Sequence, residues 1–188
     1  FVYRFHRTEH VQVLMLVLKK ALSEYGSLSA LFEKNRDLDF EDLCSQALSG
    51  AARWFQKESQ ALIKDPADWR GMRFLFNSPS TNTACKRMVM FLRWVVRKDA
   101  LDLDLPSHGL WTWFSPSELV IPVDTHVARI AYYLRLRAGK ELQAPTWRTA
   151  LEITASLRKL EPADPVRYDF ALSRLGILEI CKREYLKS

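Results

Sequence analysis

Apolar residues recur at helical spacing along this chain, and no segment alternates apolar with polar residues as a half-buried strand does. The first apolar stripe, between Thr8 and Glu24, consists of Val11, Leu14, Met15, Leu18 and Leu22. Hydrophobic residues make up 48% of the 188 residues and only 6 are Gly, which suits a compact, helix-rich core. The sequence therefore predicts an all-α fold.

Capping and turn residues divide the chain into expected helices. Their approximate ranges are 8–24, 28–35, 40–63, 66–74, 84–98, 125–137, 147–160 and from 165 to 176 or 185, with Thr8, Asp39, Asp124 and Thr146 as N-caps. The polar, Pro-containing segment 76–82 interrupts the helices. We therefore predict one helical unit over residues 1–188, with sub-lobes at about 1–76 and 77–188 and a cleft between them.

A long irregular connection, residues 99–118, is expected after the 84–98 helix. It contains Trp111, Trp113 and Phe114, and connections of this length in compact domains are often functional. Together with Trp69, these rings are candidates for an aromatic pocket that stacks on a ligand. Tryptophans are also ordinary core residues, and we assign Trp54 and Trp94 to the core.

Positive charge concentrates in the second half of the chain. Segment 84–140 holds nine Lys or Arg against five Asp or Glu, so four of the six net positive charges lie there. In the 84–98 helix, Lys86, Arg93 and Arg97 fall opposite an arc formed by Ala84, Met88, Phe91, Leu92 and Val95. This distribution favours a nucleic-acid partner. A basic stripe of this kind is also common on the solvent-exposed face of an ordinary amphipathic helix.

Two helix starts carry a candidate catalytic pair. Lys86 lies in the first turn of its helix, which is the unfavourable end for a cation. Asp124 stands at the N-cap position before an apolar stripe that begins at Val127. A local rule broken without local compensation often marks a site. We therefore pair the amine of Lys86 with the carboxylate of Asp124.

The motif Ala84-Cys85-Lys86-Arg87-Met88, followed by Ile121-Pro122-Val123-Asp124-Thr125-His126, resembles the helix-hairpin-helix–GPD superfamily of DNA glycosylases. Its 8-oxoguanine DNA glycosylase and archaeal GO glycosylase branches are the most similar in style. More narrowly, residues 78–176 look like an uncharacterised, mostly bacterial family near that superfamily. The resemblance implies a two-lobed helical fold with the active site between lobes, Lys86 as Schiff-base nucleophile and Asp124 as its carboxylate partner.

The function implied is base-excision repair by a monomeric DNA glycosylase with AP-lyase activity. Its substrate would be double-stranded DNA with a damaged base, such as the oxidised purine 8-oxoguanine. The expected DNA-binding residues are Asn82, Arg87, Arg93, Arg97, His126 and Arg129. The expected base pocket consists of Trp69, Trp111, Trp113 and Phe114.

The three cysteines, Cys44, Cys85 and Cys181, are too far apart for a zinc or ferredoxin-like motif. Some branches of the glycosylase superfamily hold an iron–sulfur cluster with four C-terminal cysteines, and only Cys181 is near this C-terminus. We expect no metal, no cofactor and a reducing, cytoplasmic, nucleoid-associated location. No long apolar run or signal-peptide pattern appears. Because the chain begins at Phe1 without Met, we expect residues upstream.

Two other classes of function remain open. Thr81-Asn82-Thr83 stands where the glycosylases have Gly-x-Gly, which fits a helix-hairpin-helix module that binds DNA without chemistry. Alternatively, Lys86 is a solvated helix lysine and Asp124 only an N-cap, as in an unrelated all-α interaction protein.

Overall fold

The computed structural model describes residues 2–3, 6–65, 69–98, 110–139 and 144–177. These residues are predominantly helical, as the apolar periodicity predicts; the only strands among them are β1 (Val2–Tyr3) and β2 (His6–Arg7), which pair antiparallel. The chain divides into two compact units, residues 1–81 and 82–188. The sequence had suggested a division near 76–77, and the cleft expected between the lobes stays a prediction.

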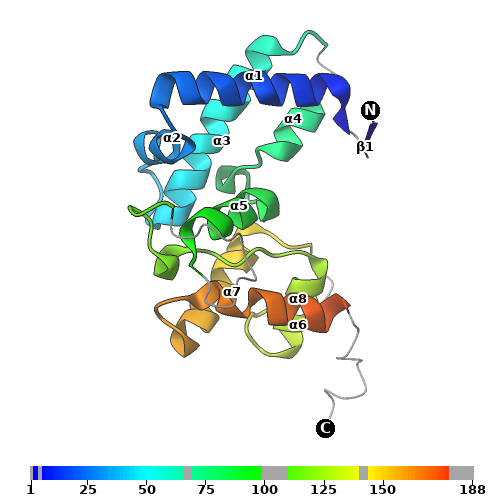
Figure 1. Cartoon of the computed structure of the whole chain (residues 1–188). Coiled ribbons are helices and arrows are strands. Elements are labelled where there is room, and N and C mark those ends of the chain that lie inside the picture. Colours follow the sequence, from blue (N-terminus) through cyan, green and yellow to red (C-terminus); the bar gives the residue numbers. More distant parts are fainter. Residues whose placement is uncertain (1, 4–5, 66–68, 99–109, 140–143, 178–188) are drawn as a thin grey trace. The chain divides into compact units, whose positions relative to one another are not determined.

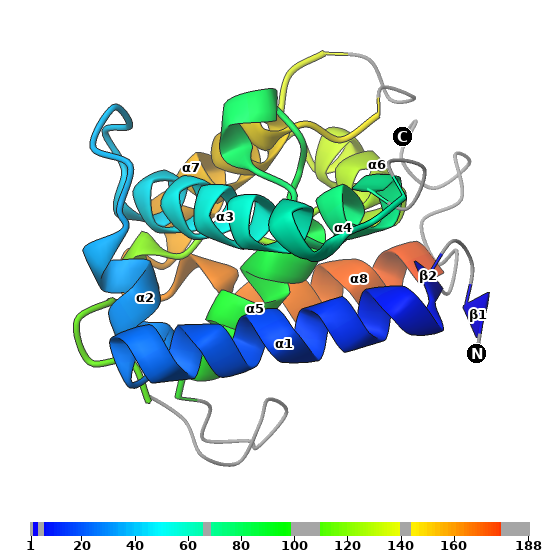
Figure 2. The ribbon, with the colours of Figure 1, turned by 90° about the horizontal axis from the view of Figure 1, so that it is seen from above.

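The first unit contains four helices in its described part: α1 (Thr8–Tyr25), α2 (Leu28–Lys34), α3 (Leu43–Leu62) and α4 (Trp69–Leu75). The turn η2 (Pro79–Thr81) follows them. Helices α1, α2 and α3 contact one another, and α4 packs on α3 (Figure 1). Gly26, with φ of 75°, ends α1, and Figure 2 shows α2 turning away at that end.

The buried face of α1 differs from the predicted stripe. Val13, Val17 and Ala21 are buried together with His10, whereas Val11, Met15 and Leu22 of the predicted stripe are exposed. The segment Val11–Leu18 is apolar almost all the way round. The apolar periodicity therefore does not determine which face of α1 is buried. Packing against α2 and α3 determines it.

Helix α3 begins three residues later than predicted. Its N-cap is Asp42 rather than Asp39, and Oδ1 of Asp42 accepts a hydrogen bond of 2.7 Å from the Ser45 N–H. Gly50, in the middle of α3, lies against the chain after α2. A Cβ added at Gly50 would stand 1.7 Å from the carbonyl oxygen of Asn35, so only glycine permits this approach.

The described part of the second unit contains α5 (Lys86–Val96), α6 (Thr125–Tyr133), α7 (Trp147–Leu160) and α8 (Asp169–Ile177), with 3₁₀ turns η3 (Pro116–Glu118) and η4 (Pro165–Tyr168). Helix α6 packs on α8, and α7 packs on η4 (Figure 1). Thr146 is the N-cap of α7, as predicted. Helix α6 ends at Tyr133 rather than near residue 137, and Arg135, two residues beyond its end, has a φ of 57°.

The two tryptophans assigned to the core from the sequence are not fully buried. Trp94, predicted to be in the core, is 36% exposed on α5, and Trp54 is half-buried.

Across the described ranges, none of the helices is both long and apolar enough to cross a membrane.

Candidate active site

The structure brings Lys86 and Asp124 into direct contact within the second unit. Lys86 is the first residue of α5, and Asp124 is the N-cap of α6. Nζ of Lys86 lies 2.6 Å from Oδ2 of Asp124, while Oδ1 of Asp124 accepts a hydrogen bond of 2.9 Å from the Val127 N–H. The two side chains are 43% and 31% exposed. A charged pair that joins two helix starts is thus partly exposed to solvent.

The surroundings of Asp124 keep it ionised at neutral pH. Partial burial opposes the charge, but the hydrogen bonds from Lys86 and from the Val127 N–H outweigh it. The positive charges of Lys86 and His126 act in the same direction, so the pKa of Asp124 falls below its ordinary value. In this structure Asp124 is therefore a carboxylate that stabilises the positive charge of Lys86.

The turn before Lys86 contains two residues with left-handed backbone, Asn82 with φ of 53° and Cys85 with φ of 48°. Asparagine tolerates this conformation better than most residues, and cysteine adopts it uncommonly. The buried thiol of Cys85 donates to the carbonyl of Thr83 over 3.1 Å, and its burial raises its pKa to about 12. The chain thus makes the turn before the lysine helix without the glycines of the resembled motif.

Asn82 also joins this turn to the start of α7. Its carbonyl accepts from the Trp147 N–H and its Oδ1 from the Arg148 N–H, both over 3.2 Å. Thr83 forms an isolated β-bridge with Thr146. The Asn82 side chain, predicted to contact DNA, therefore acts in this structure as a cap for α7.

The segment before Asp124 is buried and is also tied to α7. The Ile121 N–H donates to Oγ1 of Thr154 over 3.0 Å, and Thr154 donates to the carbonyl of Ala150 over 2.7 Å. The guanidinium of Arg158 donates to the carbonyl of Ser117 over 3.0 and 3.2 Å. Sequence reasoning missed Thr154; its signal was a hydroxyl among the mainly apolar buried residues of an amphipathic helix.

The predicted basic stripe of Lys86, Arg93 and Arg97 is not formed. Arg93 and Arg97 are each only 6% exposed. Nε of Arg97 lies 2.8 Å from Oδ2 of Asp164, and Nε of Arg93 lies 3.6 Å from Oδ2 of Asp169. The expectation that these arginines face DNA is therefore corrected: they pair with aspartates of the C-terminal segment inside the unit.

The remaining predicted DNA-binding residues lie nearer to solvent. Arg87 is exposed in the first turn of α5, beside Lys86, and His126 is exposed in the first turn of α6. Arg129, one turn further along α6, is half-buried. The start of each helix thus carries a cationic or titratable group next to the Lys86–Asp124 pair.

The predicted base pocket is mainly packed interior. Trp111 and Phe114 are buried, and Trp113 is half-buried with its ring stacked on Trp111 at a centroid distance of 6.0 Å. Phe91 of α5 meets the Trp111 ring edge-on at 5.6 Å. Trp69 belongs to α4 in the other unit. Trp111 thus packs against the helix that Lys86 begins, and Trp113 stacks on Trp111. Most of the long connection, residues 99–109, lies outside the described residues.

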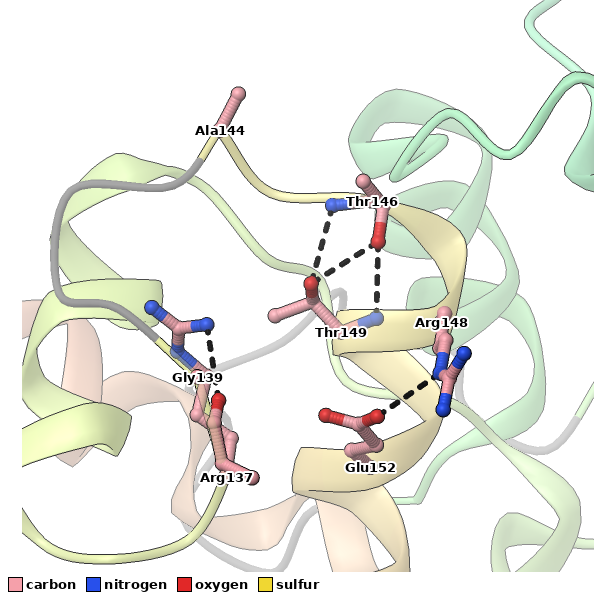
Figure 3. A pocket seen from close by; sticks show the side chains of 8 residues that line it. Arg137, Gly139, Ala144, Thr146, Arg148, Thr149 and Glu152 are labelled. Carbon is pink, nitrogen blue, oxygen red and sulfur yellow. Dashed lines mark hydrogen bonds and ion pairs between the residues drawn. The ribbon is translucent and has the colours of Figure 1, made fainter.

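A cavity of about 510 Å³ with polar and apolar lining opens beside the start of α7 (Figure 3). Its lining consists of Arg137, Ala138, Gly139, Ala144, Thr146, Arg148, Thr149 and Glu152. The Thr149 N–H donates to the hydroxyl of Thr146, and Arg148 pairs with Glu152 over 3.1 Å. The described ranges contain no group of three or more His, Cys, Asp or Glu side chains able to hold a metal ion.

Comparison with known proteins adds one finding. The model of a family described as a protein of unknown function (DUF2400) matches residues 1–178. No curated protein and no solved structure matches the chain.

Proposed function

We propose that this chain, which belongs to the DUF2400 family of unknown function, is a DNA glycosylase with Schiff-base AP-lyase activity. The observation that carries the proposal is the ion pair of 2.6 Å between Lys86 and Asp124 at the starts of α5 and α6. An amine next to a carboxylate base, half open to solvent, is the arrangement that covalent attack on a sugar carbon requires. The resemblance of both motifs to helix-hairpin-helix–GPD glycosylases supports the same reaction.

The first step is a proton transfer from the Lys86 ammonium to Asp124. In the free protein the charged forms stabilise each other, so both persist. A DNA strand that covers the pair removes water from both groups, and desolvation favours the neutral amine and the neutral acid. Lys86 then has a lone pair with which to attack.

The amine nitrogen attacks C1′ of the deoxynucleotide, and the bond from C1′ to the base breaks. The base leaves with that electron pair and takes up the proton that Asp124 received from Lys86, which returns Asp124 to its ionised form. The attached nitrogen then passes one proton to Asp124 and its second proton to the ring oxygen as the bond from C1′ to that oxygen opens, which gives a C1′=N imine and a hydroxyl at C4′. Removal of a proton from C2′ expels the 3′ phosphate and cuts the strand. Asp124, when ionised, stabilises the positive charge that develops on the sugar.

The charges around the pair suit a nucleic-acid substrate. Arg87 and His126 are exposed next to Lys86 and Asp124, and the chain carries a net charge of +6. Cationic groups near a reaction centre hold phosphates and make binding salt-dependent. We propose duplex DNA with an oxidised purine, such as 8-oxoguanine, as the substrate.

Borohydride trapping tests the proposal, because reduction of the imine leaves protein covalently bound to DNA. Wild-type protein is incubated with duplexes that contain an abasic site, 8-oxoguanine or uracil. Lys86→Gln should give no adduct but still bind, since Gln keeps length and polarity without an amine. Lys98→Gln, an exposed lysine just after α5, is the matched control and should trap like wild type.

Asp124→Asn separates catalysis from helix capping. Asn is also a good N-cap, so α6 should survive, but a neutral amide neither accepts the proton nor stabilises a cationic sugar. Base release should therefore slow while binding persists. A wild-type protein that binds duplex DNA with a steep salt dependence but traps on none of the three substrates would support the non-catalytic DNA-binding module instead. If the wild-type protein neither binds duplex DNA nor forms a trapped adduct, the remaining candidate is an all-α interaction protein.

A further inference from the structure

Both segments that carry the Lys86–Asp124 pair are fastened to the same helix, α7. The turn before Lys86 is attached at the first turn of α7 through Asn82, which accepts from the backbone N–H groups of Trp147 and Arg148. The segment before Asp124 is attached further along α7 through Thr154. From 148 to 154 the helix rises about 9 Å. Helix α7 therefore holds the lysine turn and the aspartate segment at a fixed separation.

The attachment through Thr154 is short and buried. Thr154 is 1% exposed, and its single hydroxyl both accepts from the Ile121 N–H and donates to the carbonyl of Ala150. Only Pro122 and Val123 separate Ile121 from Asp124, and both are buried. The proline ring restricts φ, so the connection has little freedom. A displacement at Ile121 is thus carried to the Asp124 carboxylate.

The attachment through Asn82 uses its unusual backbone. With φ of 53°, Asn82 directs both its carbonyl and its side-chain oxygen to the first N–H groups of α7. Cys85, three residues on, then begins α5 as its N-cap. Asn82 therefore fixes the position of the start of α5 relative to the start of α7.

We propose that α7 sets the Lys86–Asp124 distance, with Thr154 as the positioning residue for Asp124 and Asn82 as the positioning residue for Lys86. The inference rests on the proposed function for its chemical meaning, but the alignment itself is a property of the protein alone. Loss of either attachment lets the two helix starts move apart. The ion pair then lengthens while both of its members remain present.

Thr154→Val is the direct test, because valine keeps the shape of threonine and removes the hydroxyl. Thr154→Ser restores the hydroxyl. Ile153→Val is the matched control for a small change in the core, since Ile153 is the adjacent buried residue of α7. Two quantities are measured on the full chain: the pKa of Asp124 by NMR titration of its carboxyl carbon, and the single-turnover rate of borohydride trapping on abasic DNA.

In Thr154→Val, the pKa of Asp124 should rise toward the value of an ordinary aspartate, because the hydrogen bond and charge of Lys86 lower it in the wild type. The trapping rate should fall on the order of 10- to 100-fold, as expected for a reactive group misplaced by about 1 Å. Thr154→Ser and Ile153→Val should resemble wild type in both measurements. A purely structural role for Thr154 would not shift the titration of Asp124.

Asn82→Gly provides a second test on the exposed side of the unit. Glycine accepts the positive φ but lacks the oxygen that caps Arg148, so the same two changes are expected. An unchanged Asp124 pKa in folded Thr154→Val and Asn82→Gly would overturn the alignment, whatever the activity. If the wild type forms no adduct, the proposed function fails, and the titrations alone then decide whether α7 aligns the pair.

Discussion

Arg97→Met should destabilise the second unit, because Arg97 is buried against Asp164. Nε of Arg97 lies 2.8 Å from Oδ2 of Asp164, and only 8% of the arginine side chain is exposed. Methionine retains much of the packing of the arginine stem but carries no charge. The substitution therefore leaves a partly buried carboxylate facing a thioether.

The expected loss follows from the geometry. At 2.8 Å and an effective dielectric constant of about 20, the attraction between the two charges amounts to about 6 kcal/mol. Desolvation of both groups offsets part of this, and removal of one partner from a buried pair typically costs about 3–5 kcal/mol. Because the Asp164 side chain is 23% exposed, water recovers part of its solvation. We expect the free energy of unfolding to fall by about 2–4 kcal/mol.

Urea denaturation followed by tryptophan fluorescence measures this loss in wild type, Arg97→Met, Asp164→Leu and the double variant. The double variant buries no charge at this position and should be less destabilised than the sum of the single changes. An Arg97→Met variant within about 0.5 kcal/mol of wild type, with additive effects in the double, would refute the buried pair. Arg97 would then face solvent, as the sequence pattern had indicated.

Three further predictions concern the core, the thiols and acid stability. Gly50→Ala should cost about 3 kcal/mol or more of unfolding free energy in the same assay, because its Cβ would stand 1.7 Å from the carbonyl oxygen of Asn35. Iodoacetamide at about pH 8 should label neither Cys44 nor Cys85 in the folded protein and both after unfolding, because the thiols are buried and the pKa of Cys85 is about 12. Peptide mass spectrometry measures the labelling, and rapid labelling of Cys85 in the folded protein would contradict this prediction. Asp124 has a lowered pKa, so its charge stabilises the fold well above pH 3.8 and this contribution disappears as the pH falls below that value. Denaturation at several pH values should therefore find Asp124→Asn slightly less stable than wild type near neutrality and equal to it in acid.

The features that were predicted from sequence depend on neighbours a few residues away. The side chains of Asp124 and Thr146 accept from N–H groups three residues later, and a cap of this kind is readable from the residue type and the apolar stripe after it. The position of Lys86 in the first turn of a helix followed instead from the apolar periodicity of residues 84–98, because the N-cap of α5, Cys85, makes no side-chain cap hydrogen bond. Caps and periodicity therefore gave most helix ranges and the two members of the candidate pair.

The features that were mispredicted depend on partners far along the chain. Arg97 pairs with an aspartate 67 residues later, and no local pattern distinguishes such a buried arginine from one that faces solvent. Trp111 is likewise buried by its tertiary neighbours, and it was expected in a pocket. The buried face of α1 was misassigned because its sequence offers apolar residues on both sides, so that only the packed helices decide between them.

The two oxygens of Asp124 have separate partners, and this fixes how the carboxylate behaves when Lys86 changes. Oδ1 is held by the Val127 N–H, so the rotamer is set when the first turn of α6 forms. In the proposed reaction the lysine nitrogen forms a covalent bond and Oδ2 loses its partner, but the hydrogen bond to Oδ1 still holds the carboxylate in place. The conformational entropy of orienting this carboxylate is therefore lost during folding rather than during the proposed reaction. A glutamate at position 124 would keep the charge, but its extra methylene would separate the helix cap from the ion pair and restore that freedom.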